Sequence, residues 1–198
     1  MLIIVQFFFY RYNSETLGAG VINCDLLGHE AYHPGTLGFT KVVDAFGKEM
    51  IGSDGLIDRR KLGAKVFGID NVKNKQKLES IVWPEIWKIV EKQIAFMWKE
   101  QGKHVVIIDA AVLLQAGWKD QVNQVWVSIV DPETAVKRIM ERDRKSEDEA
   151  HKRLSSQLSN QKYVNDANVV FCSKWEVSYT KKQVDKAWMY LIENYIKN

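Results

Sequence analysis

The sequence predicts an α/β fold in which a parallel β-sheet is covered by helices on both faces. Short apolar runs rich in valine and isoleucine alternate along the chain with segments whose apolar residues recur every three or four positions. The 198 residues contain only three prolines and no low-complexity tract. We therefore expect a single domain, residues 1–198, that is large enough to bury a core.

Four apolar runs are predicted to be strands of this sheet. The clearest is His104–Asp109, because its four consecutive β-branched residues indicate a strand that is buried on both faces. Such a strand brings its last polar residue to the carboxyl edge of the sheet, where ligands bind. The predicted strands are Val21–Cys24, His104–Asp109, Gln124–Val130 and Ala167–Cys172.

The first residues form a fifth apolar run, Leu2–Phe9. It is much shorter than the roughly 20 residues that a membrane-spanning helix needs. It also lacks the basic start and the small-residue cleavage site of a secretory signal. We predict a buried strand, and the alternatives are a membrane or targeting element and a segment that does not fold.

Helical patterns lie between the predicted strands. Pro84–Gln101 carries one apolar stripe, and its proline is typical of a helix start. The other helix starts follow capping patterns, in which a side chain bonds to the free N–H groups of the first turn. These starts are predicted at Asp131-Pro132, at Ser146 with Glu149, and at Thr180 with Gln183.

Charge and cysteine content restrict the function only weakly. The net charge of +3 is too small to indicate nucleic-acid binding, although it suits an anionic small molecule. Cys24 and Cys172 lack the spacing of a metal site or a disulfide framework, so we expect small apolar residues in buried strands and a reducing compartment. The four histidines have no metal spacing either, and no metal site is predicted.

Two stretches of the chain resemble a single enzyme family. They read Val-Ile-Asn-Cys-Asp-Leu-Leu-Gly-His-Glu-Ala-Tyr at 21–32 and Ile-Asp-Ala-Ala-Val-Leu-Leu-Gln-Ala-Gly-Trp at 108–118. These stretches look like the dephospho-coenzyme A kinase family, and most closely like the kinase domain of the animal bifunctional coenzyme A synthase. Trp83-Pro84, in place of the bacterial His-Pro, is also typical of the animal enzymes.

The resemblance implies a fold, a reaction and a cellular setting. The fold would be a parallel sheet like that of P-loop nucleotide kinases, with a helical CoA-site insertion at about 36–97 and a helical lid at about 138–160. The reaction would be phosphorylation of the ribose 3′-hydroxyl of dephospho-CoA in coenzyme A biosynthesis, with ATP and Mg²⁺ as cofactors. The resemblance also implies a location in the cytosol and mitochondria, no membrane insertion, and fusion to an adenylyltransferase domain in the full-length protein.

Asp25 and Arg142 are the candidate catalytic residues. A carboxylate at the end of a strand can accept the proton of an attacking hydroxyl, and Asp25 matches the second aspartate of the family's Asp-x-Asp pattern. The first position of that pattern is Asn23, which can align a substrate but carries no charge. Arg142 matches the lid arginine that stabilises charge on the transferred phosphoryl group. The alternatives are a helix N-cap for Asp25 and a solvated charged face around Arg142.

Other residues are candidates for binding the substrate and the nucleotide. His29 lies in the family's Gly-His-x-Ala-Tyr segment, and Asp109 either meets the substrate or caps the end of its strand. Arg59 takes the arginine position of Gly-x-x-x-Arg-x-x-Leu, and the alternative is a simple ion pair with Asp54 or Asp58. The substrate candidates are Asn23, His29, Arg59 and Asp109, and the candidates for ATP binding are the lid residues Arg138 and Arg144.

One expected motif, the phosphate-binding loop G-x-x-x-x-G-K-[ST], does not occur in the 198 residues. Met1–Thr16 contains no glycine and is unrelated to the family, so the resemblance covers about Leu17–Asn198. The near candidates, Gly18–Gly20 and Gly35–Gly38, lack the Gly-Lys-Ser/Thr ending. Leu2–Phe9 is apolar enough to fill the vacant central position of the sheet, but it would not restore ATP binding.

Three interpretations therefore follow from the sequence. The first is an enzyme of the dephospho-CoA kinase type. The second is a non-catalytic relative that binds a CoA-like ligand or a partner protein. The third is a gene model in which other sequence has replaced the family's own N-terminal segment.

Overall fold

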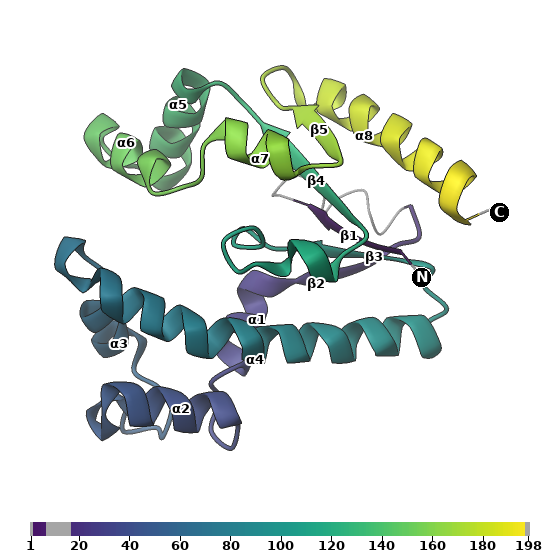
Figure 1. The fold of residues 1–198 in the computed structure, drawn as a ribbon. Helices are drawn as coiled ribbons and strands as arrows, with labels where there is room; N and C mark the ends of the chain where they lie inside the picture. Colours follow the sequence, from purple (N-terminus) through teal and green to yellow (C-terminus); the bar gives the residue numbers. More distant parts are fainter. Residues whose placement is uncertain (1, 7–16, 197–198) are drawn as a thin grey trace. The chain divides into compact units, whose positions relative to one another are not determined.

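The computed structural model describes residues 2–6 and 17–196 (Figure 1). It divides into two compact units. We call Met1–Val21 together with His104–Asn198 the sheet unit, and Ile22–Lys103 the helical unit. The single domain expected from the sequence stays a prediction.

Five strands form one sheet with the order β2-β3-β1-β4-β5. The pairs β1–β3, β1–β4 and β4–β5 are parallel, so the predicted α/β fold with a parallel sheet is confirmed. The four strands expected between residues 21 and 172 are all present, with ends that differ by one or two residues. The strands are β1 (Leu2–Gln6), β2 (Gly20–Asn23), β3 (Val105–Asp109), β4 (Gln124–Ile129) and β5 (Val169–Cys172).

Strand β1 occupies the central position of the sheet, as its apolar sequence predicted. It pairs with β3 from Leu2 opposite Val105 to Gln6 opposite Asp109, and with β4 over three further positions. A central strand needs an apolar sequence because both of its faces are covered. The last three residues of the predicted strand, 7–9, lie outside the described residues.

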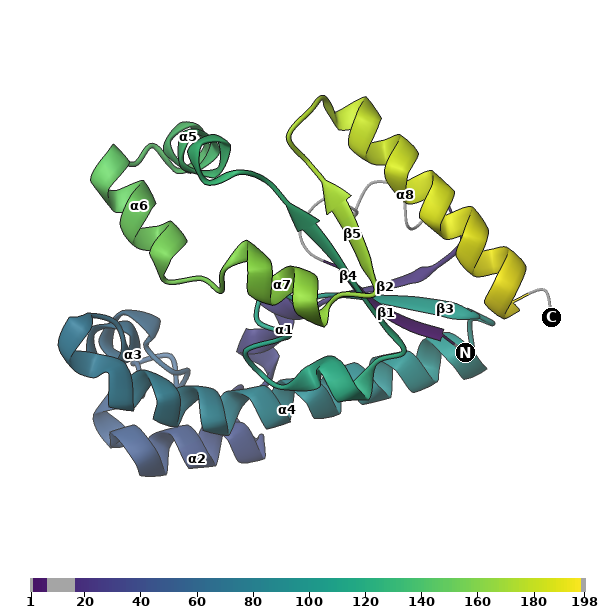
Figure 2. The same ribbon diagram turned by 45° about the horizontal axis from the view of Figure 1, so that its top comes forward.

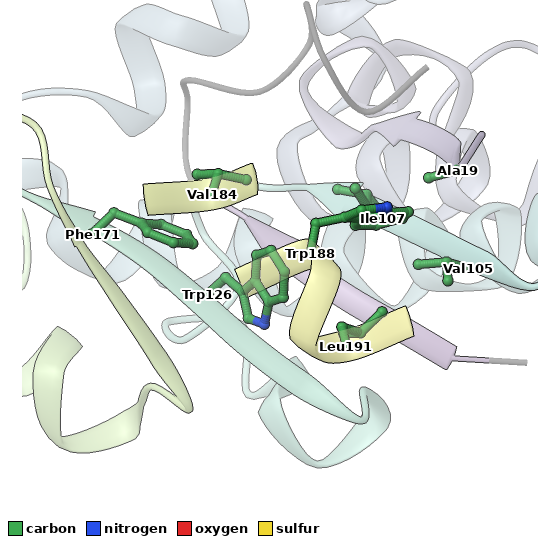
Figure 3. Packing of buried hydrophobic residues seen from close by; sticks show 8 residues of the cluster. All are labelled: Ala19, Val105, Ile107, Trp126, Phe171, Val184, Trp188 and Leu191. Carbon is green, nitrogen blue, oxygen red and sulfur yellow. The ribbon is translucent and has the colours of Figure 1, made fainter. Parts of the chain in front are cut away.

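Both faces of the sheet are covered. Val105 to Ile108 of β3 and Val125 to Val127 of β4 are all buried, and successive strand residues point to opposite faces. On one face, helix α8 (Val177–Leu191) packs Val184, Trp188 and Leu191 against the strands (Figure 3). In the same cluster the rings of Trp126 and Phe171 meet edge to face, with centroids 5.6 Å apart.

The start of α8 differs from the expectation. Thr180 with Gln183 was predicted as a capping box, but the helix begins at Val177, so this prediction is wrong. Gln183 instead bonds to the edge strand β5: its amide oxygen accepts from the Cys172 N–H at 3.0 Å, and its amide nitrogen donates to the Cys172 carbonyl at 2.9 Å. This side chain thus takes the place of a neighbouring strand at the exposed edge.

The remaining helices of the sheet unit include a hairpin of α5 and α6. Val136, Ile139 and Ala150 form a small core between these two helices. The predicted caps at Asp131 and Ser146 are confirmed, because each side chain accepts a backbone N–H in the first turn. The helices are η3 (Trp118–Gln121), α5 (Pro132–Asp143), α6 (Glu147–Ser155), α7 (Asn160–Asp166) and the π-helical turn η4 (Ile192–Ile196).

The helical unit is built on one long helix, α4, which contacts α1, α2 and α3 (Figure 2). The prediction that Pro84 starts a helix is wrong, because α4 begins at Val72 and Pro84 lies inside it. An interior proline costs about 3 kcal/mol. The buried stripe of this helix outweighs that cost, since its aliphatic side chains contribute roughly 1.5–3 kcal/mol each; it comprises Val82, Ile86, Val90 and Ile94. The helices are α1 (Cys24–Glu30), α2 (Leu37–Phe46), η1 (Lys48–Met50), α3 (Arg59–Val66), η2 (Ile69–Asn71) and α4 (Val72–Lys99).

The two cysteines differ from the buried strand residues that were expected. Cys24 is buried but is the first residue of α1, and Cys172 is in a strand but is exposed; neither forms a disulfide bond. No helix among the described residues has the length and apolar character needed to cross a membrane.

Candidate active site

Asp25 lies in the first turn of α1, directly after β2. The residue that caps this helix is Asn23, whose Oδ1 accepts the backbone N–H of Asp25 at 3.0 Å. The alternative role for Asp25, a helix N-cap, is therefore wrong. The Asp25 side chain itself is exposed, and its action on a ligand stays a prediction.

The structure brings His29 and Arg59 together, as two of the substrate candidates. Nδ1 of His29 lies 3.1 Å from the Tyr32 hydroxyl, and the two rings meet edge to face at 6.1 Å. Burial and then the positive charge of Arg59 lower the pKa of His29. Burial raises the pKa of Tyr32, and Arg59 opposes that rise. The charge of Arg59 thus acts on both side chains.

Arg59 is positioned by the cap of helix α3. The Asp58 carboxylate accepts the backbone N–H groups of Arg60 and Lys61 at 3.0 and 3.1 Å, which places Arg59 at the first helical position. In the part of the chain that the structure describes, Arg59 forms no ion pair with Asp58 or with Asp54. The alternative of a simple ion pair is therefore wrong for these residues.

Asp109 is the last residue of β3 and stands opposite Gln6, the last residue of β1. Because the two strands are parallel, both residues lie at the carboxyl edge of the sheet, where ligands of open α/β sheets bind. Asp109 therefore lies at the edge where the sequence placed it. Its contact with a substrate stays a prediction.

Arg142, near the end of α5, is held by its neighbour. Its Nε and Nη2 donate to the two carboxylate oxygens of Asp143 at 2.8 and 3.0 Å, and this pairing raises the pKa of Arg142. Arg153 of α6 donates to the same carboxylate at 2.7 Å. The Arg142 side chain remains 47% exposed, so it can still reach a phosphate by exchanging Asp143 for that ligand.

The other two lid arginines occupy different settings. Arg138 donates from Nη2 to the Ser173 carbonyl at 2.6 Å and from Nη1 to the Ser173 hydroxyl at 3.3 Å, so it fastens α5 to the segment after β5. Arg144 ends α5 with a positive φ of 52° and is exposed. Within residues 2–6 and 17–196 it makes no ion pair, and its guanidinium is open to solvent.

Sequence reasoning missed three residues that contact the candidates within their own units: Tyr32, Asp143 and Ser173. Tyr32 follows His29 by three positions, a spacing that brings side chains together at a helix end, so this signal was present. Asp143 adjoins Arg142 in the sequence, but its second partner, Arg153, comes from another helix. Ser173 meets Arg138 across 35 positions, and only the fold reveals that contact.

Asp25 belongs to the helical unit and Arg142 to the sheet unit, so their joint catalytic role stays a prediction. No group of three or more histidine, cysteine, aspartate or glutamate side chains that could hold a metal ion exists among the described residues.

Comparison with known proteins agrees with the resemblance seen in the sequence. The family model for dephospho-CoA kinase matches residues 11–177. A dephospho-CoA kinase of Geobacter sulfurreducens is 36% identical over 174 residues, which cover 88% of this chain and 87% of that protein. A solved Thermus thermophilus protein shares the fold with a TM-score of 0.72 at 20% identity, over 96% of this chain and 97% of that chain. The dephospho-CoA kinase of Campylobacter jejuni does so with a TM-score of 0.68 at 22% identity, over 96% of each chain. The chain belongs to the dephospho-CoA kinase family.

Proposed function

We propose that this chain transfers the γ-phosphoryl group of ATP to the ribose 3′-hydroxyl of dephospho-CoA. The observation that carries this proposal is the family match across residues 11–177, which includes the exposed carboxylate of Asp25 directly after β2. A strand end is where enzymes of this architecture hold the groups that act on a ligand.

Three of the candidate residues have roles in the phosphoryl transfer itself. The Asp25 carboxylate accepts the proton as the 3′-oxygen attacks the γ-phosphorus, the bond between that phosphorus and the β,γ-bridging oxygen breaks, and ADP leaves. Asn23 aligns the hydroxyl beside Asp25. Arg142 stabilises the negative charge that spreads over the transferred group, after its guanidinium exchanges Asp143 for phosphate oxygens.

Binding of the two substrates is assigned to the other candidates. His29, Arg59 and Asp109 contact dephospho-CoA, while Arg138 and Arg144 contact ATP. Mg²⁺ is usually held by one or two carboxylates together with substrate phosphates and water. Asp109 fits that limited role, and the metal ion would help to neutralise the phosphate charge.

The lack of a phosphate loop favours a second candidate function. No Gly-Lys-Ser/Thr sequence is present among the 198 residues, so backbone N–H groups of such a loop do not hold the ATP phosphates. Positioning of these phosphates supplies most of the rate of a phosphoryl-transfer enzyme. The second candidate is therefore a non-catalytic relative that binds dephospho-CoA without phosphorylating it.

One pair of measurements separates the two candidates. The purified chain is assayed for ADP release with ATP, Mg²⁺ and dephospho-CoA, and dephospho-CoA binding is measured by calorimetry. Asp25→Asn should lower the turnover rate about 10²- to 10⁴-fold, because a general base contributes that much. Asp44→Asn, which changes an exposed carboxylate of α2, is the matched control and should be neutral.

Each outcome assigns a function. Turnover by the wild-type chain that Asp25→Asn abolishes supports the kinase. Turnover that Asp25→Asn leaves unchanged rejects Asp25 as the base. Saturable binding of dephospho-CoA without turnover establishes the non-catalytic relative, and neither binding nor turnover refutes both candidates.

We also propose the finer features that the animal resemblance implies. These are the insertion at about 36–97, the lid at about 138–160, a fused adenylyltransferase domain, and a location in the cytosol and mitochondria. The compact α5–α6 hairpin and the helical unit support the first two, and Trp83-Pro84 supports the animal origin. Sequencing the transcript upstream of Leu17 tests the fusion and reveals whether a phosphate-loop exon exists there.

A further inference from the structure

His29, Tyr32 and Arg59 form a cluster in the helical unit that carries positive charge without a counter-ion. In the described chain, no carboxylate pairs with His29 or Arg59. The lysines of the neighbouring helices contrast with this, because Lys41, Lys61 and Lys65 each have an acidic partner. An exposed arginine beside an imidazole, with no acidic group to neutralise it, is a setting that favours an anionic ligand.

The hydrogen bond between Tyr32 and His29 determines which imidazole nitrogen faces a ligand. Burial favours the protonated phenol of Tyr32, so its hydroxyl is available as a donor. Burial and Arg59 both favour the neutral form of His29, which has one donor and one acceptor nitrogen. When Nδ1 accepts the Tyr32 hydroxyl, the proton of the neutral ring must lie on Nε2.

This arrangement gives the imidazole a defined direction. Nδ1 is engaged by Tyr32, and in the tautomer in which Nδ1 accepts, Nε2–H on the opposite side of the ring is the donor. Phosphate oxygens only accept hydrogen bonds, so they require donors such as Nε2–H and the guanidinium of Arg59. The Tyr32 hydroxyl is engaged by Nδ1 of His29, at 3.1 Å.

We propose that Tyr32 is a positioning residue, which holds His29 so that its Nε2–H and the Arg59 guanidinium together bind one phosphate group of dephospho-CoA. This inference rests on the proposed function for its ligand and assigns Tyr32 a role at the same site. The group that the two side chains bind is a phosphate ester or a diphosphate. The adenosine part of the substrate does not contribute to this binding.

Nitrogen NMR of histidine-labelled protein tests the proposal directly. The chain has four histidines, so His29→Gln assigns the His29 signals by their loss. We expect the Nε2–H tautomer in the wild-type protein. Tyr32→Phe keeps the ring contact but removes the hydroxyl, so the tautomer preference should be lost and the pKa of His29 should rise.

Two arginine variants form a matched pair. Arg59→Met should raise the pKa of His29, because it removes the nearby positive charge. Arg60→Met changes the next residue of the same helix, which does not act on His29, and should leave that pKa unchanged. Arg59→Met should also weaken dephospho-CoA binding about tenfold or more, as expected for the loss of a charged donor.

Ligand additions complete the test. Dephospho-CoA and pyrophosphate should each raise the pKa of His29 in the wild-type chain, because a bound anion favours the charged imidazole, whereas adenosine should not. In the turnover assay, Tyr32→Phe should raise KM for dephospho-CoA several-fold with little change in kcat.

The results discriminate between this inference and the proposed function. A response of His29 to dephospho-CoA in a chain without turnover supports the phosphate site and rejects only the catalysis. An Nδ1–H tautomer, equal effects of the two arginine variants, or no response of His29 to dephospho-CoA or pyrophosphate overturns the role of Tyr32, whatever the turnover.

Discussion

Glu85 joins helix α2 to helix α4, and its replacement by glutamine tests how firmly the helical unit is held together. Its side chain is 10% exposed. One carboxylate oxygen accepts from Lys41 of α2 at 2.9 Å, and Lys88, one turn further along α4, lies 3.1 Å from both oxygens. The contact with Lys41 is the one that links the two helices.

The expected loss follows from these contacts. Glu85→Gln keeps the volume and an acceptor oxygen but removes the charge. A hydrogen bond to a charged group contributes about 1.5–3 kcal/mol, against about 1 kcal/mol for a neutral one. Lys41 and Lys88 are 43% and 54% exposed, so water compensates part of the difference. We expect α2 to open more easily by about 1–2 kcal/mol, and its amides to exchange roughly 5- to 30-fold faster.

Native-state hydrogen exchange of the amides in Leu37–Phe46 measures this opening. Lys88→Met is the matched control, because it removes a partner that lies within α4 itself and should change α2 by no more than about 0.5 kcal/mol. Equal acceleration in the two variants, or none in Glu85→Gln, would refute the idea that Glu85 joins the helices.

The same contact should depend on pH. The Lys41 hydrogen bond, with a smaller contribution from Lys88, holds the pKa of Glu85 below its usual 4.5. A carboxylate with a lowered pKa stabilises the fold fully above its unfolded value, and this contribution disappears as the pH falls through the folded-state pKa. Protection of α2 in the wild-type chain and in Glu85→Gln should therefore converge below pH 4.5, and a difference that persists at low pH would contradict this cause.

Three further changes test contacts in the sheet unit. Gln183→Ala removes both bonds to the Cys172 backbone, so the free energy of unfolding should fall by about 1–2 kcal/mol in urea titrations; an unchanged midpoint means that water replaces the amide. The backbone N–H of Thr134 donates to the Asp131 carboxylate and lowers the pKa of Asp131 to about 2. The stabilisation by this cap is therefore complete above pH 3.8 and is lost as the pH approaches 2. Asp131→Asn should flatten this acid transition in circular dichroism. Arg138→Met should accelerate hydrogen exchange of α5, because it frees the helix from Ser173; unchanged exchange with weaker ATP binding would assign Arg138 to the nucleotide.

The sequence was sufficient for the strands and for the helix starts at Asp131 and Ser146, but not for the starts of α4 and α8. Each strand is a short run of β-branched residues, and its ends are visible in the sequence because polar or turn residues follow. The length of α4 was underestimated because Pro84 is a strong local signal for a helix start. The buried apolar residues of α4 lie on both sides of Pro84. Their burial is a tertiary effect, which the helix propensities of the residues do not include.

For the candidate site, the sequence identified residue types but not their partners. His29 and Arg59 are 30 positions apart, and only the packing of the helical unit brings them together. Arg138 was selected for its charge, yet Ser173 engages that charge from a distant segment. A motif records which side chain is needed, whereas its neighbours in other elements decide whether the side chain is available for a ligand.

A parallel sheet requires little of its central strand, whereas a phosphate site requires particular residues. β1 pairs with β3 through its backbone from Leu2 to Gln6, and any apolar sequence can do this. A phosphate loop instead needs glycines at the carboxyl end of a strand. In the described chain, Gly18 and Gly102 have positive φ but precede β2 and β3, so they lie at the opposite edge of the sheet. We therefore expect nucleotide binding to depend on exposed cations such as Arg144, with an affinity that falls steeply as salt is added.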